Sequence, residues 1–453
     1  MKMKYLLVIN LIIYNLCLGQ ENNLELLYQW TDDGTVLNAE DNPGDNWVGN
    51  IYNEIWGFVQ NNHEFAVIGT TQGTHIFDVT DPVNSYLIAS IDGASTSSEV
   101  VHRDFHTYNG YLYTVADEMN SSTLQIIDIS NVPNSVEIVY NSNDIITRAH
   151  NIFIDENNGI MYVCGGKVNG TSNNLCLMSL NNPEDPVFLT DYDNHGYVHD
   201  IYVIDNVGYL NAADNGIHIV DFSDFNNPET LGSLTDYPYK GYNHSGWLNS
   251  DGNIYVFADE NHGYKMKICD VSNPSDITVT ATLLSDVESN SIAHNVIIKD
   301  NLLYVSHYYD GLWIWDISNP AEPAYVASYD TYPLAGGNSY KGAWGVYPLL
   351  PSGNILVSDM QYGLFVLAPP EYTTNINEQN ITSVFPNPCK DILNIKEEGV
   401  NNIKLYDMYG KLLISTKVFH NNVSLQLNFL KPGVYLLITE NGKNKSEHKV
   451  VKY

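Results

Sequence analysis

The chain has 453 residues and a strongly acidic composition, with 53 Asp and Glu against 20 Lys and Arg and a formal net charge of −33. So acidic a surface repels nucleic acid and anionic lipid, which argues against both as partners. Hydrophobic residues make up 44% of the chain, enough for a full core and too many for a disordered protein. Aromatic residues make up 12% and charged residues only 16%, a mixture that favours strands over helices.

The N-terminus has the features of a targeting signal. Lys2 and Lys4 precede an apolar run from Tyr5 to Leu18, and the small residue Gly19 follows. A basic start, a short apolar run and a small residue before the cut are typical of a secretory signal peptide. We therefore predict that residues 1–19 are removed. No later segment reaches the roughly 20 apolar residues of a membrane span, so we expect no transmembrane segment in the mature chain.

A repeated phrase organises residues 20–370. Its clearest copies are IFDVTDP at 76–82, IIDISNVP at 126–133, ICDVSNP at 268–274 and IWDISNP at 314–320. Each unit begins at a start position upstream of this phrase. The seven start positions are Trp56, His102, His150, His199, His244, His294 and Trp344. They recur about every 48 residues, which is within the range of propeller repeats.

Within one unit the pattern is that of four short strands. In the sixth unit these are HNVIIKDN, LLYVSHY, GLWIWDIS and AYVASYD, separated by turn residues. Four strands per unit and seven units predict an all-β, seven-bladed β-propeller. The seventh unit lacks its fourth strand, and LELLYQWTD at 24–32 has the pattern of the missing one. We predict that Leu24–Trp30 pairs with Leu364–Leu367 and closes the ring, which leaves no open edge.

At this point the repeat resembles a known family. The phrase G-L/I-x-I-x-D-V/I-S-N-P is similar to the LVIVD-type repeat. The stretches YNEIWGF (52–58), GTHIFDVTDP (73–82) and HRDF (102–105) resemble the choice-of-anchor B family of secreted bacterial propellers. The resemblance implies a propeller and a surface location. The family itself carries no settled biochemical activity, so the resemblance assigns none.

The C-terminal part has a different composition. The polar stretch 371–380 is typical of a linker, and residues 381–453 predict a small β-sandwich with a lysine-rich end. FPNP (385–388), IKLYDMYGKLL (403–413) and LKPGVYLLI (430–438) are similar to the type A sorting domain of the type IX secretion system. The resemblance implies that the type IX machinery binds 381–453 and exports the chain through the periplasm and outer membrane. The protein is then expected at the cell surface or outside the cell.

The start positions predict a candidate site. The first strand of each propeller blade lines the central channel, so the five start histidines are expected around one mouth, with Trp56 and Trp344 completing the ring. His102 and His150 are the candidate catalytic residues. The second strands end at the same face, and their carboxylates are candidate ligands of a divalent metal such as Ca²⁺ or Zn²⁺: Asp117, Glu118, Asp259 and Glu260. In the alternative interpretation, the histidines hold the loops of neighbouring blades together.

Basic residues are scarce in the repeat region, and four of them flank start positions. These are Arg103, Arg148, Lys240 and Lys341. A few cations gathered at one concave place attract anions to it, and arginine can form two parallel hydrogen bonds with a carboxylate or sulfate group. We therefore predict an anionic ligand, such as an acidic glycan, at the mouth of blades 2 and 3. The alternative is that these cations pair with nearby carboxylates.

Three functions remain open from the sequence. The first is an exported module that binds a glycan, a protein or another surface ligand at the channel mouth. The second is an extracellular polysaccharide lyase or hydrolase that uses the same histidines and arginines. The third is a structural adhesin. Cys164 and Cys176 lie on neighbouring strands, where they either form a disulfide or act as small core residues.

Overall fold

The structure is a computed structural model. It describes residues 24–32, residues 49–370 except 98, 119–120, 286, 288–289 and 335–339, and residues 383–453 except 386, 397–401, 408–410, 418–421 and 442–443. The chain divides into two compact units, Met1–Pro370 and Glu371–Tyr453. Among the described residues, strands dominate and the only helices are the single turns η1 (Pro82–Asn84) and η2 (Pro274–Asp276). The predicted signal peptide (1–19) and linker (371–380) lie outside the described residues.

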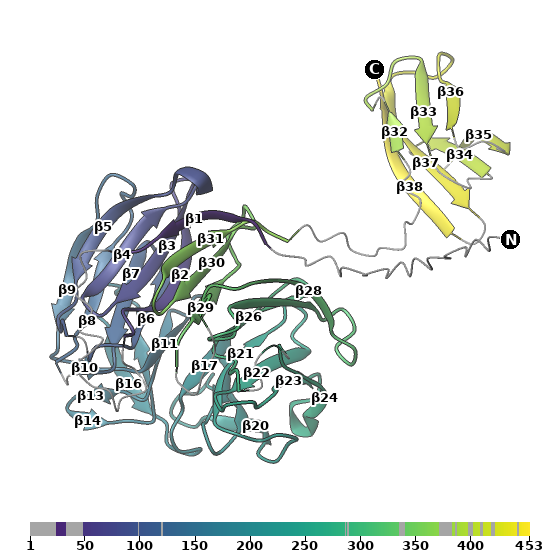
Figure 1. Ribbon diagram of the computed structural model, residues 1–453. Coiled ribbons are helices and arrows are strands. Elements are labelled where there is room, and N and C mark those ends of the chain that lie inside the picture. Colours follow the sequence, from purple (N-terminus) through teal and green to yellow (C-terminus); the bar gives the residue numbers. More distant parts are fainter. Residues whose placement is uncertain are drawn as a thin grey trace, which may run out of the picture. The chain divides into compact units, whose positions relative to one another are not determined.

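The first unit is built from seven four-stranded antiparallel sheets, the blades of a β-propeller (Figure 1). It also contains a small three-stranded sheet of β10 (Ile146–Arg148), β13 (Lys167–Val168) and β14 (Thr171–Ser172). Blades 1 and 2 contain β2 (Tyr52–Gln60), β3 (His63–Thr70), β4 (Gly73–Asp78), β5 (Tyr86–Asp92), β6 (Arg103–Tyr108), β7 (Tyr111–Ala116), β8 (Leu124–Asp128) and β9 (Glu137–Ser142). Blades 3 and 4 contain β11 (Asn151–Asp155), β12 (Ile160–Cys164), β15 (Leu175–Ser179), β16 (Val187–Asp191), β17 (Asp200–Ile204), β18 (Val207–Asn211), β19 (Ile217–Asp221) and β20 (Glu229–Leu234).

The remaining blades follow the same order. Blades 5 and 6 contain β21 (Asn243–Leu248), β22 (Ile254–Asp259), β23 (Met266–Asp270), β24 (Thr278–Leu283), β25 (Val296–Lys299), β26 (Leu302–Ser306), β27 (Leu312–Asp316) and β28 (Ala324–Tyr329). Blade 7 contains β29 (Ala343–Tyr347), β30 (Ile355–Asp359), β31 (Gly363–Leu367) and β1 (Leu26–Trp30). The predicted all-β propeller is confirmed.

The strand at the N-terminus closes the ring as the sequence predicts. β1 runs antiparallel to β31, with Leu26 opposite Leu367 and Trp30 opposite Leu364. The Trp30 ring then packs against Phe77 of blade 1, with ring centroids 4.8 Å apart. Because this strand comes from the start of the chain and β29 to β31 from the end of the repeats, blade 7 holds the two ends of the propeller together.

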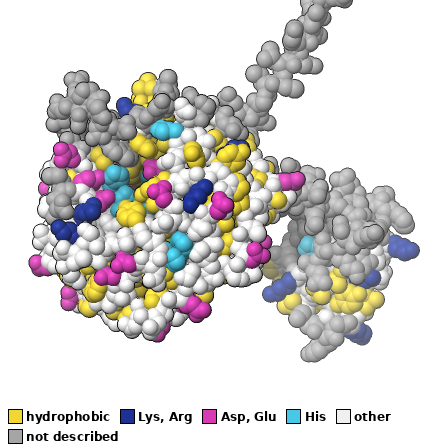
Figure 2. All heavy atoms as spheres, turned by 90° about the horizontal axis from the view of Figure 1, so that it is seen from below, with side chains coloured by type: hydrophobic (Ala, Val, Ile, Leu, Met, Phe, Trp, Pro, Cys, Tyr) yellow, Lys and Arg dark blue, Asp and Glu magenta, His cyan; other side chains and the backbone are white. Residues whose placement is uncertain are grey.

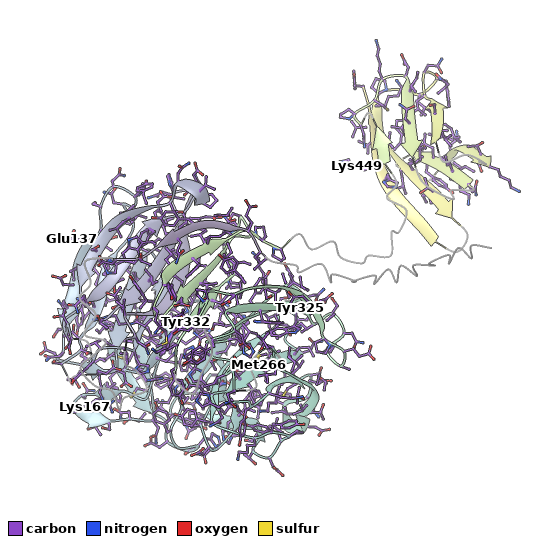
Figure 3. The ribbon with its side chains drawn as sticks, in the orientation of Figure 1. Glu137, Lys167, Met266, Tyr325, Tyr332 and Lys449 are labelled. Carbon is purple, nitrogen blue, oxygen red and sulfur yellow. The ribbon has the colours of Figure 1, made fainter. Side chains whose placement is uncertain are left out.

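The hydrophobic core lies between the blades, because each sheet buries both of its faces. One core, for example, joins Val256 and Ile268 of blade 5 to Val296 and Leu303 of blade 6. Side chains fill these spaces, as around the fully buried Met266 (Figure 3). The Asp of the repeated phrase ends the third strand and caps the next turn. The Asp316 carboxylate, for instance, accepts a 2.7 Å hydrogen bond from the backbone N–H of Ser318.

The two cysteines of blade 3 do not form a disulfide. Cys176 lies opposite Val163, and Cys164 lies opposite Leu175. Neighbouring residues on a strand point to opposite faces of the sheet, so the two thiols enter different cores. Both are free and buried. The interpretation as small core residues is correct, and the disulfide alternative is wrong.

The second unit has two small antiparallel sheets. The first contains β32 (Ser383–Phe385), β33 (Ile392–Lys396) and β36 (Asn422–Gln426). The second contains β34 (Asn402–Asp407), β35 (Leu412–Lys417), β37 (Gly433–Asn441) and β38 (Asn444–Lys452). Leu393 of the first sheet and Leu405 and Leu437 of the second belong to one buried core. This unit therefore has a core of its own.

Candidate functional site

Six aromatic side chains form a closed ring at one mouth of the propeller channel. Neighbouring ring centroids are 4.2 to 5.3 Å apart around the sequence His102, His150, His199, His244, His294 and Trp344. We call this set the histidine ring. It borders a hollow of about 200 Å³. In the space-filling view, histidine and acidic side chains lie together in a hollow, and Lys and Arg side chains are dispersed (Figure 2). The structure thus brings the five predicted histidines together.

Three of these histidines are held by the backbone of the next blade. The Nδ1 atoms of His199, His244 and His294 lie 3.2, 3.2 and 2.7 Å from the carbonyl oxygens of His244, His294 and Trp344. A carbonyl oxygen only accepts, so each Nδ1 carries the hydrogen and the lone pair of the neutral ring lies on Nε2. The histidines therefore do link neighbouring blades, as the alternative interpretation holds. The same bonds also leave their Nε2 atoms as acceptors.

Burial keeps these three imidazoles neutral. It lowers the pKa of His244 to about 3 and that of His199 and His294 well below the ordinary value. The charges of neighbouring histidines add to the effect, because a second imidazolium in the same ring would repel the first. At neutral pH this side of the ring presents uncharged nitrogen lone pairs.

The opposite side of the ring is held by carboxylates. Glu118 bonds the Nδ1 of His102, and Asp117 lies 2.9 Å from the Nδ1 of His150. Burial lowers the pKa of His102, but the hydrogen bond and charge of Glu118 outweigh it, so the pKa of His102 is raised. Arg148 also pairs with Asp117, at 2.7 Å. The ring is therefore asymmetric, with a protonatable histidine on one side and neutral histidines on the other.

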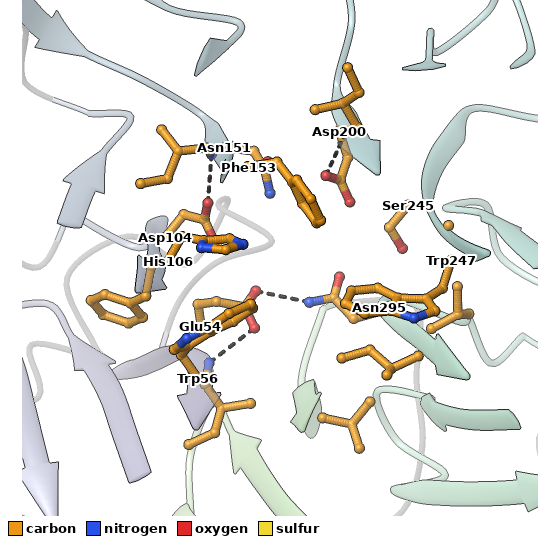
Figure 4. A pocket seen from close by; sticks show the side chains of 18 residues that line it. Glu54, Trp56, Asp104, His106, Asn151, Phe153, Asp200, Ser245, Trp247 and Asn295 are labelled. Carbon is orange, nitrogen blue, oxygen red and sulfur yellow. Dashed lines mark hydrogen bonds between the residues drawn. The ribbon is translucent and has the colours of Figure 1, made fainter. Parts of the chain in front are cut away.

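A second layer below the histidine ring is acidic. Glu54, Asp104 and Asp200 come from blades 1, 2 and 4, and their carboxylates turn toward the channel (Figure 4). Glu54 accepts hydrogen bonds from Asn295 Nδ2 at 2.9 Å and from Trp344 Nε1 at 3.2 Å. Burial raises the pKa of Glu54 to about 7 and that of Asp200 to about 8, and it raises that of Asp104 as well.

The start positions alone do not predict this layer, although the sequence contains a signal for it. Asp104 stands two residues after its start position, and Asn151, Asp200 and Asn295 stand directly after theirs. A polar residue so placed after a channel-lining histidine recurs in these repeats.

A third layer of aromatic rings fills the channel below the carboxylates. Trp56 lies 4.5 Å from His106, and Phe153 lies 5.3 Å from Tyr202, measured between ring centroids. The space left among these rings and the acidic layer is about 60 Å³, much less than the hollow at the mouth. Trp56 thus belongs to this layer, and the prediction that it completes the histidine ring is wrong. We call the hollow of about 200 Å³ that the histidine ring borders the histidine mouth, and it is roomier than the space among the aromatic rings.

The predicted cluster of cations does not form. Arg103 borders the hollow, but its guanidinium is buried and donates to the carbonyl oxygens of Thr70 at 2.6 Å and Ser95 at 2.8 Å. Arg148 pairs with Asp117. Lys240 donates to the carbonyl oxygen of Thr235 and lines a different hollow, and Lys341 is half-buried just before β29. Among the described residues, these four cations therefore do not gather around the hollow as one group.

The four candidate metal ligands are also separated. Asp117 and Glu118 bond His150 and His102 on the other side of the ring. Asp259 forms a fully buried ion pair with Lys267, in which Oδ2 of the carboxylate lies 2.5 Å from Nζ of the lysine. Only Glu260 faces the neutral side of the ring, with Oε2 3.7 Å from His244 Nε2. Among the described residues, the donor atoms of His199, His244 and Glu260 lie within 4.8 Å of one another.

The pKa shifts of the buried acids and histidines predict how the stability of the fold depends on pH when a chelator is present. Glu54 and Asp200 bind protons more tightly in the folded state, so the folded protein loses their stabilising contribution as the pH rises toward about 7 and about 8. Burial lowers the pKa values of His244 and His307 to about 3, so the folded protein loses their contribution as the pH falls below about 6.5. We expect the thermal midpoint to fall above about pH 6.5 and below about pH 4.5. A midpoint that still rises between pH 7 and 8 would contradict these assignments.

Two known families match parts of the chain. The LVIVD repeat family matches residues 103–140, 195–236 and 291–331, and the family described as secretion system C-terminal sorting domain matches 383–453. A search of curated proteins finds no match. Among solved structures, the chain is similar to the computationally designed Ika8 protein, with 13% identity, a TM-score of 0.42, and 89% of this chain and 97% of that chain covered.

The sorting domain places the protein outside the cell. It indicates export by the type IX secretion machinery, to the cell surface or the extracellular space. No helix in the described part of the chain has the length and apolar character needed to cross a membrane. The chain is thus an exported β-propeller that contains three matches to the LVIVD repeat and a match to a secretion-system C-terminal sorting domain.

Proposed function

We propose that this exported propeller is a ligand-binding module whose site is the histidine mouth, and that the site selects a cation. The observation that carries the proposal is the crowding of carboxyl groups in the lining. Four carboxyl side chains border the hollow, those of Glu54, Asp104, Asp200 and Glu260, and the guanidinium of Arg103 beside them donates to the backbone oxygens of Thr70 and Ser95. A cation in the hollow would take the place of the protons that burial holds on these carboxyl groups.

An anionic ligand fits this lining poorly. It would enter among carboxyl groups, and the cationic side chains at the mouth are already paired with carboxylates, Arg148 with Asp117 and His102 with Glu118. A lyase or hydrolase acting on an acidic polysaccharide would face the same obstacle, since such a reaction needs a positive group against the substrate carboxylate. Binding of a cation is therefore the better supported function.

Calorimetric titration of the chelator-treated full chain tests the proposal. The cationic probes are tetramethylammonium, Ca²⁺ and Zn²⁺, and the anionic probes are sulfate and galacturonate. We expect at least one cation to bind and neither anion to do so. Asp200→Asn and Glu54→Gln should weaken cation binding at least tenfold, whereas Asp214→Asn, outside the histidine mouth, should not. Anion binding without cation binding, or cation binding indifferent to Asp200→Asn and Glu54→Gln, would refute the proposal.

Export can be tested separately from binding. Deleting residues 371–453 removes one compact unit together with the matched sorting domain. We expect the truncated propeller to keep its thermal midpoint but to accumulate in the periplasm. The measurement is a fractionation of cells followed by immunoblotting. Truncated protein that still reaches the medium would show that another segment directs export.

A further inference from the structure

We propose that His199, His244 and Glu260 form a site for one divalent transition-metal ion of the zinc type. The inference rests on the proposed function, because it names the cation that the histidine mouth takes. It goes beyond it by assigning the ligands, the donor atoms and the class of metal.

The spacing of the donor atoms suits such an ion. Zinc binds imidazole nitrogen and carboxylate oxygen at about 2.0–2.2 Å, so two ligands at a tetrahedral angle lie about 3.4 Å apart. His244 Nε2 and Glu260 Oε2 are 3.7 Å apart, and the donor atom of His199 lies within 4.8 Å of both. Because the distances to His199 are at most 4.8 Å, combined shifts of up to about 1.4 Å would bring the three donor atoms onto one ion.

The contact between His244 and Glu260 is unfavourable without an ion. His244 Nδ1 carries the hydrogen that bonds the His294 carbonyl oxygen, so Nε2 of the neutral ring is an acceptor. A carboxylate oxygen is an acceptor as well, and 3.7 Å is too long for a hydrogen bond in either direction. Two lone pairs thus face each other in a buried hollow. A metal ion between them would bind both.

Each ligand is also fixed by a second contact, as metal ligands in proteins commonly are. The backbone carbonyl groups of His244 and His294 hold the rings of His199 and His244 through Nδ1. The Tyr308 hydroxyl donates a 2.6 Å hydrogen bond to Glu260 Oε1, which leaves Oε2 for the metal. The donors are therefore oriented before any ion arrives.

The kind of donor decides the kind of metal. Two imidazole nitrogens and one carboxylate oxygen suit Zn²⁺ and neighbouring transition metals, whereas Ca²⁺ and Mg²⁺ prefer oxygen donors alone. Three protein ligands leave one position of a tetrahedral ion open toward the hollow of about 200 Å³. His102 and His150 are not part of this set, because among the described residues it is the donor atoms of His199, His244 and Glu260 that lie within 4.8 Å of one another.

The test is Zn²⁺ titration of the chelator-treated full chain, with the visible spectrum of bound Co²⁺ as a second readout. We expect one ion per chain and a tetrahedral Co²⁺ spectrum. His244→Ala and Glu260→Gln should weaken Zn²⁺ binding by at least 100-fold, and Tyr308→Phe by about 10- to 100-fold. The matched controls are His195→Ala and Glu184→Gln, because Glu184 also accepts a hydrogen bond from a tyrosine, Tyr111, but lies away from the site. Both controls should bind Zn²⁺ as the unaltered chain does.

The outcomes separate this inference from the proposed function. If tetramethylammonium or Ca²⁺ binds but Zn²⁺ does not, the histidine mouth is a cation site and the metal assignment is wrong. If Zn²⁺ binds equally to Glu260→Gln and to Glu184→Gln, the ligands are wrong. Glu260→Gln keeps the size of the side chain, so it remains informative even if His244→Ala fails to fold. If no cation binds, both proposals fail.

Discussion

Replacing Lys267 with methionine is expected to destabilise the propeller by about 3–5 kcal/mol, because it leaves the Asp259 carboxylate buried without its counter-ion. Both side chains are fully buried, and Lys267 Nζ lies 2.5 Å from Asp259 Oδ2. Tyr237 donates a 3.1 Å hydrogen bond to the other carboxylate oxygen, which would not compensate the charge. The free energy of unfolding in urea measures the effect.

A double variant distinguishes the buried charge from lost packing. Lys267→Met with Asp259→Asn removes both charges and keeps similar side-chain volumes, so it should recover most of the stability lost in Lys267→Met alone. If the double variant is no more stable than the single one, the loss comes from packing and not from the unpaired carboxylate.

Arg103→Ala is the second change with a large expected effect. It removes the donors of the Thr70 and Ser95 carbonyl oxygens in a buried place, and each unsatisfied group costs about 1–3 kcal/mol. We expect a loss of about 2–6 kcal/mol in the free energy of unfolding. Arg148→Ala is the matched control, because its half-exposed pair with Asp117 should contribute about 1 kcal/mol or less. Equal and small effects of the two variants would contradict a structural role for Arg103.

The sequence predicts the fold well because the repeat is regular. Seven start positions and the missing fourth strand of the last unit predict the blades and the strand that closes them, and β1 pairs with β31 in the predicted place. Trp56 shows the limit of counting. Trp56 packs beside His106 in the aromatic layer, where Phe153 and Trp247 stand three residues after His150 and His244, so Trp56 is not the counterpart of those start histidines.

The candidate site was predicted in part. The five histidines meet because each stands at the same position of its unit. Arg103 directly follows His102, but its guanidinium turns toward the carbonyl oxygens of Thr70 and Ser95. Asn151, Asp200 and Asn295 directly follow their histidines and do line the channel, so the distance along the chain from a start position does not decide where a side chain points. Which carboxylate faces which histidine depends on loop contacts such as Tyr308 with Glu260, and no sequence pattern encodes these.

Anomalous diffraction at the zinc absorption edge, from crystals of the full chain grown with Zn²⁺, tests the central claim most directly. We predict one strong peak at the channel mouth, within bonding distance of His199 Nε2, His244 Nε2 and Glu260 Oε2. A peak beside His102 and Glu118, a peak only on the outer surface, or no peak at the mouth despite stoichiometric zinc in solution would contradict it.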